Sequence, residues 1–319
     1  MLDQKYFWGV VAALAIAGLF IEQSTIFHMM ILFFIWSIVV SGWDLVTGYT
    51  GLFSFAQLVF FAVGAYATAM LVINHGVDPL LAIPLAALVG AFAGALVGLP
   101  CLRLRGEYVA MFTFAVHLAM PPLLIQGRGI GTGGSTGLMG MPPLEIFGQT
   151  LFTGNRIAWY YFALVVAVML IYFIYYQLIP RKWGRAFVTI RDSEMFARSL
   201  GVNEYKYKLL AFAISAAVTA IAGSLYALYI GVASPRLLGN EFFLMVMLML
   251  AVGGLGRFPG VILGAAIITV GNELLRGTGE WRLLFLGISV VIALLLLPNG
   301  VIGIRERLTT LYRWLRRPA

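Results

Sequence analysis

Residues 79–101 read Pro79-Leu-Leu-Ala-Ile-Pro-Leu-Ala-Ala-Leu-Val-Gly-Ala-Phe-Ala-Gly-Ala-Leu-Val-Gly-Leu-Pro-Cys101 and contain no charged side chain. A helix needs about 20 apolar residues to cross the roughly 30 Å hydrocarbon core of a bilayer, and this stretch is long enough to do so. It therefore predicts a transmembrane helix. Small residues fall on one face of that helix and predict a close contact with a neighbour. They are Ala91, Gly94, Ala95 and Gly98.

The composition of the whole chain agrees with this stretch. Of 319 residues, 61% are hydrophobic and 11% are charged, whereas soluble domains carry about 25% charged residues. Too little polar material remains to cover a water-soluble globule, which excludes a soluble enzyme and a disordered chain. The single cysteine, Cys101, excludes an intrachain disulfide and a multi-cysteine metal site.

Ten apolar runs are candidates for membrane spans, so we expect an all-α integral membrane protein with about ten transmembrane helices in a single domain over residues 1–319. The eighth and ninth runs are short and are joined by the turn Gly256-Arg257, which leaves open two tilted short helices or a re-entrant pair. The first run follows Lys5 without a small-residue cleavage site, so we expect a retained span. The runs are Tyr6–Ile21, Ile26–Trp43, Leu52–Ile73, Pro79–Cys101, Tyr108–Gln126, Ile157–Leu178, Leu209–Val232, Phe242–Leu255, Phe258–Gly271 and Leu283–Ile302.

The basic residues gather on one side of the membrane. With the N-terminus placed inside, sixteen of the 21 Lys and Arg residues lie in inside segments. Cytoplasmic loops carry an excess of Lys and Arg, so both termini are expected in the cytoplasm. The net charge of +8 is then a sign of topology, and we expect no nucleic-acid partner. The five outside residues are Arg128, Arg156, Arg236, Arg276 and Arg282.

Two loops are long enough to carry function. The outside loop over residues 127–156 is rich in Gly and Pro, and the inside loop over residues 180–208 is the most charged segment of the chain. A short basic tail over residues 305–319 is expected on the inside.

The chain lacks the residues that would drive transport by itself. Ion-coupled carriers place acidic, basic or histidine side chains within their spans, but here Asp44 and Glu107 sit at span ends and His117 alone is deep in a run. We expect His117 to pack against a backbone group or hydroxyl. The sequence has no Gly-Lys pair for a phosphate-binding loop, no zinc-protease motif and no serine-nucleophile motif. We therefore expect no catalytic residue, no metal site and no cofactor on this chain. If the chain transports a solute, we expect a partner to supply the energy.

The segment from Gly48 to Thr68 mixes glycines and hydroxyl groups into an apolar run. A broken helix that exposes its backbone together with Thr50, Ser54 and Gln57 would suit the path of a polar solute. Ordinary packing of small residues explains the same composition equally well. Both interpretations remain open at this point.

The inside loop predicts a short helix. Asp192 or Ser193 can cap its N-terminus, Glu194 lies in its first turn and Gly201 follows its end. Phe196 and Leu200 are four residues apart on one face, while charged residues recur along another: they are Arg191, Glu194 and Arg198. Such a helix can dock into the groove of a soluble partner. A helix lying on lipid headgroups is the alternative.

Several motifs in this order resemble the permease subunits of branched-chain amino-acid ABC importers, specifically the M-type partner of the paired permeases. The motifs are Gly48-Tyr-Thr-Gly-Leu-Phe-Ser54, Gly64-Ala-Tyr-Ala-Thr68, Arg103-Leu-Arg-Gly-Glu-Tyr108, Gly133-Gly-Ser-Thr-Gly-Leu138, Gly184-Arg-Ala186 with Ile190-Arg-Asp-Ser-Glu194, Ala197 and Leu200-Gly201, Tyr207-Lys-Leu-Leu-Ala-Phe212, and Gly253-Gly-Leu-Gly-Arg-Phe-Pro-Gly-Val261. They cover nearly the whole chain after the first two spans.

The resemblance implies a multi-pass subunit of a bacterial or archaeal cytoplasmic membrane. Its implied partners are a second, similar permease, two cytoplasmic ATPases that bind ATP, and a periplasmic solute-binding protein. The 127–156 loop is expected on the periplasmic side. It implies that the 180–208 loop couples to the ATPase through Gly184, Arg185, Arg191, Asp192, Ser193, Glu194, Phe196, Ala197, Leu200 and Gly201. The translocation path is expected at Gly48, Tyr49, Thr50, Gly51, Ser54, Gln57, Gly64 and Tyr66.

Two segments depart from the pattern of that family. Phe55-Ala56-Gln57 stands where the family usually has Leu-Gly-His/Gln-Ala, and the segment from Phe112 to Pro121 is also unusual. Both are expected near the path, so urea, an amide, an aromatic acid or another amino acid remains an alternative solute to a branched-chain amino acid. A secondary carrier or facilitator without an ATPase is a further alternative.

Overall fold

The computed structural model describes residues 3–21, 23–104, 106–146, 149–151, 156–275, 279, 281–296, 300–301 and 303. The basic tail predicted over residues 305–319 lies outside the described residues, as do residues 147–148 and 152–155 of the predicted outside loop. The described part is predominantly helical, as expected, and its few strands are short.

The elements follow the apolar runs of the sequence closely. In chain order they are α1 (Gln4–Phe20), α2 (Ser24–Asp44), the π-helix η1 (Leu45–Tyr49), α3 (Gln57–His75), α4 (Pro79–Cys101), α5 (Glu107–Gln126), the 3₁₀ helix η2 (Gly127–Ile130), β1 (Leu138–Met139), β2 (Leu144–Ile146), β3 (Gln149–Leu151), α6 (Arg156–Tyr172), the π-helix η3 (Phe173–Leu178), α7 (Lys182–Asp192), α8 (Glu194–Ser199), α9 (Glu204–Ile230), β4 (Val232–Ala233), the 3₁₀ helix η4 (Pro235–Leu238), α10 (Asn240–Gly253), α11 (Gly260–Leu274) and α12 (Trp281–Leu296).

Six helical segments among the described residues are long and apolar enough to cross a membrane. They are Ser24–Tyr49, Gln57–His75, Pro79–Cys101, Glu107–Gly129, Arg156–Leu178 and Glu204–Ile230. The other apolar helices are shorter. At 1.5 Å per residue, the 14 residues of α10 and the 15 of α11 extend about 21 Å and about 23 Å, which is less than the roughly 30 Å hydrocarbon core. The eighth and ninth predicted runs are thus two short helices with a turn between them.

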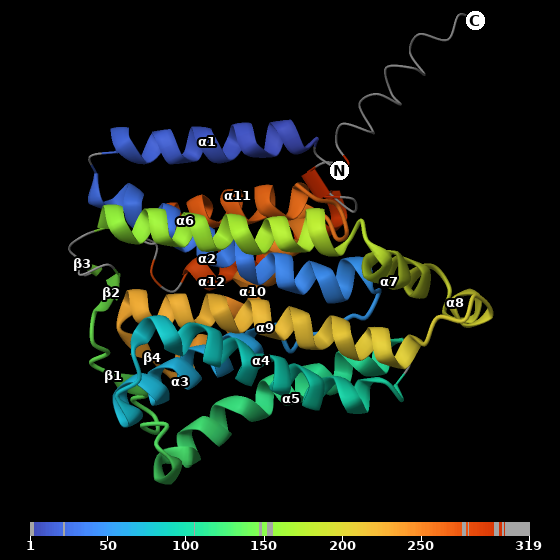
Figure 1. Cartoon of the computed structure of the whole chain (residues 1–319), viewed down its shortest axis with the longest axis horizontal. Helices are drawn as coiled ribbons and strands as arrows, with labels where there is room; N and C mark the ends of the chain where they lie inside the picture. The colour runs from blue at the N-terminus through green and yellow to red at the C-terminus, as the bar shows by residue number, and fades with distance from the viewer. Residues whose placement is uncertain are drawn as a thin grey trace, which may run out of the picture.

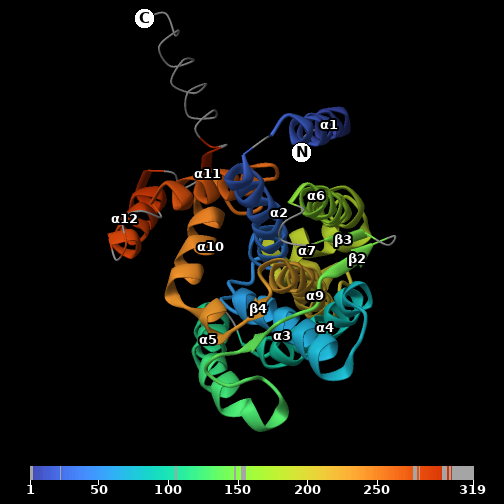
Figure 2. The same cartoon turned by 90° about the vertical axis from the view of Figure 1, so that its left-hand side faces the viewer.

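Helix α9 occupies the middle of the bundle and packs against α2, α3, α4 and α6 (Figure 2). Its contact with α4 is close because glycines on α4 face its backbone. A Cβ atom added to Gly94 would lie 2.4 Å from Ala216 Cβ and 2.7 Å from the Phe212 carbonyl oxygen.

Two of the four small residues predicted to form the contact face of α4, Gly94 and Gly98, are buried. The buried positions repeat every fourth residue and are Ala82, Ala86, Gly90, Gly94 and Gly98. Ala91 and Ala95 are only partly buried. The contact therefore follows an i, i+4 row of residues. Packed helices commonly place such rows into the grooves between the rows of the neighbouring helix.

The two ends of the bundle differ. Figure 1 shows α7 and α8 at one end, where they project beyond the ends of the neighbouring helices, and α1 also begins at that end. The strands lie at the opposite end. There β1 pairs antiparallel with β4, joining Leu138 to Ala233, and β2 pairs with β3 in a hairpin.

Candidate functional site

The inside loop folds into two helices, because the chain breaks at Ser193. Its backbone is extended, with φ −164° and ψ 115°, and its hydroxyl oxygen accepts a hydrogen bond from the Phe196 amide at 3.2 Å. Of the two predicted caps, Ser193 is the one that caps α8, whereas Asp192 is the last residue of α7. Gly201 follows α8 with φ +75°, as its predicted role as a helix stop requires.

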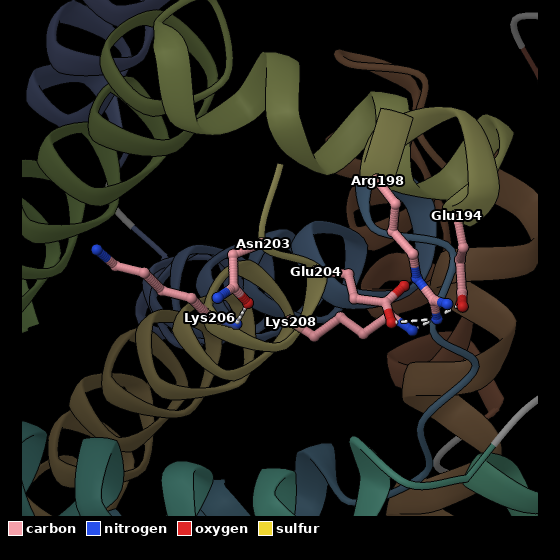
Figure 3. A network of polar contacts seen from close by, with 6 residues as sticks. All are labelled: Glu194, Arg198, Asn203, Glu204, Lys206 and Lys208. Atoms are coloured by element: carbon pink, nitrogen blue, oxygen red, sulfur yellow. Dashed lines mark hydrogen bonds and ion pairs between the residues drawn. The ribbon is translucent and has the colours of Figure 1, made fainter. Parts of the chain in front are cut away.

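Two ion pairs attach α8 to the first turns of α9 (Figure 3). Lys208 Nζ lies 2.6 Å from Glu194 Oε1, and Arg198 pairs with Glu204. Lys208 and Glu204 are both buried. The Glu204 carboxylate raises the pKa of the Arg198 guanidinium above its usual value. The predicted charged face of the helix is thus turned toward its own protein, and Arg191 is excluded from it because it belongs to α7.

The opposite face of α8 is apolar and exposed. Phe196 and Leu200, predicted on one face, are 59% and 61% exposed, and Met195 beside them is 82% exposed. Ala197, which directly follows Phe196, is fully buried. Met195 was absent from the predicted set because its spacing from Phe196 and Leu200 marks no helical face. Met195, Phe196 and Leu200 are called the apolar knob below.

Helix α7 is held to the bundle by its buried side. Phe187 and Ile190 are buried, while Arg185 is exposed. Gly184 lies against the backbone at Ile179, which directly follows η3: a Cβ atom there would approach the Ile179 carbonyl oxygen to 2.2 Å. The α7–α8 pair therefore has a base, α7, that packs on the bundle and a projecting tip, α8.

The segment between α2 and α3 is a broken helix. The backbone passes through η1, leaves helical geometry over residues 50–56 and resumes helix at Gln57. The predicted polar residues do not face an open path, because Thr50, Ser54 and Gln57 are all buried. Thr50 Oγ1 donates to the Leu45 carbonyl oxygen at 2.9 Å, and Gln57 pairs with Thr219 and Ser215 of α9.

The groups that the break exposes are apolar side chains and backbone atoms. Gly51 is exposed and Phe53 is 48% exposed, whereas Tyr49 is buried. Further along α3, Gly64 packs against the backbone of α9 at Ala220, as the packing interpretation expects. Tyr66 is buried, and its hydroxyl has no hydrogen-bond partner within the described ranges.

Three segments distant in sequence meet at the end of α2. Asp44 is fully buried, and its Oδ1 accepts a hydrogen bond from the Gly256 amide at 2.6 Å. Its Oδ2 accepts from the hydroxyl of Tyr175 at 3.0 Å. Gly48 lies against both Asp44 and Gly256 and has no room for a side chain. A Cβ atom on Gly48 would approach Asp44 Oδ1 to 2.1 Å and the Gly256 nitrogen to 2.4 Å. Arg191 of α7 also contacts this group of residues, through a hydrogen bond to the Gly48 carbonyl oxygen. Asp44, Gly48, Tyr175, Arg191 and Gly256 are called the α2-end cluster below.

The sequence marks parts of the α2-end cluster separately. Asp44 is an acid at a span end, and Gly256 belongs to the turn between two short apolar runs. The sequence pattern does not connect these two residues. Tyr175 carried no signal, because one tyrosine among many aromatic residues in a span is unremarkable.

An aromatic cluster lies beside the break. Phe55 packs against Phe114 and Phe243, with ring centroids 5.9 Å and 5.6 Å apart, and His117 lies 4.9 Å from Phe243. The two segments that depart from the family pattern therefore contact each other. His117 is packed as expected, but against aromatic rings rather than a backbone group or hydroxyl. Its Nδ1 has no hydrogen-bond partner in the part of the chain that the structure describes.

Known proteins resemble the chain over most of its length. The family model described as "Branched-chain amino acid transport system / permease component" matches residues 25–295. The high-affinity branched-chain amino acid transport system permease proteins LivM of Salmonella typhimurium and of Escherichia coli are each 32% identical, over 94% of this chain and 75% of theirs. The corresponding LivH protein of Salmonella typhimurium is 29% identical over 38% of this chain and 40% of its own. No solved structure matches the chain.

Proposed function

The chain belongs to the branched-chain amino acid transport permease family, and from this premise we propose that it is a subunit of an ATP-driven ABC importer. It forms half of a translocation path for branched-chain or related hydrophobic amino acids. The other half is a second, similar permease, for which the partial similarity to LivH is the support. Two separate ATPase subunits hydrolyse ATP, and a periplasmic binding protein delivers the solute.

The observation that carries this proposal is the apolar knob on α8. Met195, Phe196 and Leu200 are exposed at the projecting end of the bundle (Figure 1), and apolar side chains in such a position gain free energy by entering the groove of a partner. Because Glu194 and Arg198 are paired with residues of α9, a displacement of α8 by a partner would be passed on to the rest of the chain.

The same contacts weigh against a helix that lies on lipid headgroups. That arrangement places basic residues on the phosphate side and buries the apolar face in the acyl chains. Here the basic residue of α8, Arg198, is paired with Glu204 of the same protein. The apolar side chains are instead exposed on a helix that projects beyond the neighbouring helices (Figure 1). A soluble partner therefore explains the exposed face better.

We propose about ten membrane helices, some of them short or broken, with the α7–α8 end in the cytoplasm. The start of α1 lies at that same end (Figure 1), and seven of the basic residues occur in the 180–208 loop, in agreement with an inside location. The 127–156 loop then faces the periplasm of a bacterial or archaeal cell. Helices α10 and α11 are too short to cross as straight, full-length spans, and protein around them must cover their ends.

The solute path is proposed to pass the break between α2 and α3, where the chain meets the second permease. Gly51 and Phe53 are exposed there, so they are the candidates for contact with a hydrophobic solute. The break itself is held in place by hydrogen bonds of three buried residues, which are Thr50, Ser54 and Gln57.

Copurification tests the assembly. The chain is expressed with an affinity tag beside the ATPase, second-permease and binding-protein genes of its own cell, and the bound proteins are identified. We expect both the ATPase and the second permease to copurify. The ATPase should be lost in Phe196→Asp and retained in Met139→Asp, which changes an exposed residue of β1 at the opposite end of the bundle. Recovery of the chain alone, with solute transport by that chain in vesicles, would establish the facilitator alternative.

The solute class is tested on the binding protein. Leucine, isoleucine, valine, phenylalanine, urea, acetamide and benzoate are screened by thermal shift. A shift confined to the branched-chain amino acids supports the proposal, and a shift confined to urea, amides or aromatic acids contradicts it.

A further inference from the structure

Arg191 connects the last turn of α7 to the broken helix. Its Nη1 donates a hydrogen bond to the carbonyl oxygen of Gly48 at 2.9 Å, and its Nη2 lies 3.1 Å from Asp192 Oδ1. The donors of a guanidinium are fixed in a planar fork, so two simultaneous contacts define the orientation of the side chain. Gly51, near the start of the break, lies against the same side chain: a Cβ atom there would approach Arg191 Cγ to 2.8 Å.

The carbonyl group that Arg191 contacts lies at a helix end. The last carbonyl groups of a helix lack intrahelical partners, and a cation placed there is favoured by the helix dipole. Gly48 lies in the last turn of η1. Arg191 therefore stabilises the point at which the span ceases to be helical, and removing its guanidinium leaves that end free to rearrange.

The other side of the α2-end cluster is held by the turn between α10 and α11. Gly256 has φ +66° and donates its amide to Asp44, one turn before Gly48. The contacts of Asp44 with Gly256 and Tyr175 come from elements of the bundle, whereas Arg191 comes from the projecting pair α7–α8. Of the contacts that hold the end of α2, the one to Arg191 is thus the contact that a movement of the cytoplasmic pair would alter directly.

We propose that Arg191 is a positioning residue for transport. Movement of α7 and α8 withdraws its guanidinium from the Gly48 carbonyl and thereby changes the conformation of residues 45–56, past which the solute moves. This inference rests on the proposed function, because it requires an ATPase that moves α8.

The test uses the complete complex, reconstituted in proteoliposomes with its second permease, ATPases and binding protein. Two quantities are measured for the wild type, Arg191→Gln, Arg191→Lys and the control Lys182→Gln, which removes a positive charge from the exposed first residue of the same helix. One is the amount of solute taken up per ATP hydrolysed. The other is hydrogen exchange in residues 45–56 and 193–201, with and without a non-hydrolysable ATP analogue.

For Arg191→Gln we expect uptake per ATP to fall about tenfold, the effect of losing one charge-assisted hydrogen bond. The nucleotide-dependent change in exchange persists in residues 193–201 and disappears in residues 45–56. In Arg191→Lys, uptake per ATP should fall about threefold, because lysine keeps the charge but cannot contact the Gly48 carbonyl and Asp192 at the same time. Lys182→Gln should match the wild type. A role in stability alone would not separate the two exchange responses.

Unchanged uptake per ATP in Arg191→Gln, or a nucleotide response in residues 45–56 that survives the substitution, overturns the role of Arg191 while the proposed function stands. If Arg191→Gln does not assemble, Arg191→Lys decides in the same way, and a wild-type ratio there overturns the inference. An absence of any nucleotide response in residues 193–201 of the wild type overturns the proposed function, and the inference with it.

Discussion

The ammonium group of Lys208 lies 2.6 Å from the carboxylate of Glu194, and this contact ties α8 to α9. A helix of six residues is too short to be stable by itself, so its shape depends on such tertiary contacts. The side chain of Lys208 is 4% exposed and that of Glu194 is 38% exposed. The apolar knob is therefore held in position by a charge pair whose basic member is buried in the bundle.

Replacing Lys208 should release α8. For Lys208→Met we expect hydrogen exchange in residues 194–201 to accelerate by about tenfold or more, since a hydrogen bond to a charged group contributes roughly 1.5–3 kcal/mol. Lys206→Met is the matched control, because Lys206 is exposed in the same turn of α9. Equal exchange in the two variants would show that the ion pair does not hold the helix.

Ser193→Ala should destabilise the start of α8. The hydroxyl oxygen of Ser193 accepts the Phe196 amide hydrogen bond, and loss of such a cap costs about 0.5–2 kcal/mol. The rate of tryptic cleavage after Arg198 should rise accordingly. Ser193→Asp retains an acceptor and should cleave at the wild-type rate. Rapid cleavage of Ser193→Asp would contradict the capping role.

Gly94→Leu should destabilise the bundle, because the added side chain meets Ala216 and the Phe212 carbonyl group. Overpacking of this kind costs roughly 1–3 kcal/mol. Thermal unfolding in detergent should therefore begin at a lower temperature. Ala91→Leu, on a partly buried position of the same helix, should unfold close to the wild type. Equal destabilisation by Gly94→Leu and Ala91→Leu would support the stripe predicted from spacing, which contains both positions.

Phe53→Ser should weaken the interaction with a hydrophobic solute. Phe53 is half-exposed at the break, and losing its apolar contact should raise the KM for uptake by about fivefold or more while leaving basal ATP hydrolysis unchanged. Phe92→Ser serves as the comparison, since Phe92 is exposed on α4 away from the break. An unchanged KM for Phe53→Ser would remove the break from the solute path.

Much of the fold follows from the sequence because a bilayer accepts few structures. The uncharged run over residues 79–101 becomes α4 over the same residues, and the cap and stop residues Ser193 and Gly201 act as expected. The short eighth and ninth runs also form two helices with a turn between them. These features depend on local composition, which the sequence displays directly.

The polar contacts could not be predicted in the same way. Gln57 was expected to face a solute path, yet it is paired with Ser215 and Thr219, because a buried amide must find partners in its own protein. Arg191 was grouped with Glu194 and Arg198 by helical spacing, and the break at Ser193 invalidates that spacing. The meeting of Asp44 with Gly256 depends on tertiary packing over a separation that periodicity does not encode.

ATP-dependent uptake is the most direct test of the claim that this chain is a permease driven through α8. Proteoliposomes that contain the complete complex and enclosed ATP are supplied with the binding protein and radiolabelled leucine. The wild type should accumulate leucine only with ATP, and Glu194→Gln/Phe196→Asp should fall to background while the chain remains inserted. Unchanged ATP-dependent uptake by that double variant, or equal uptake by this chain alone without ATP, would contradict the account.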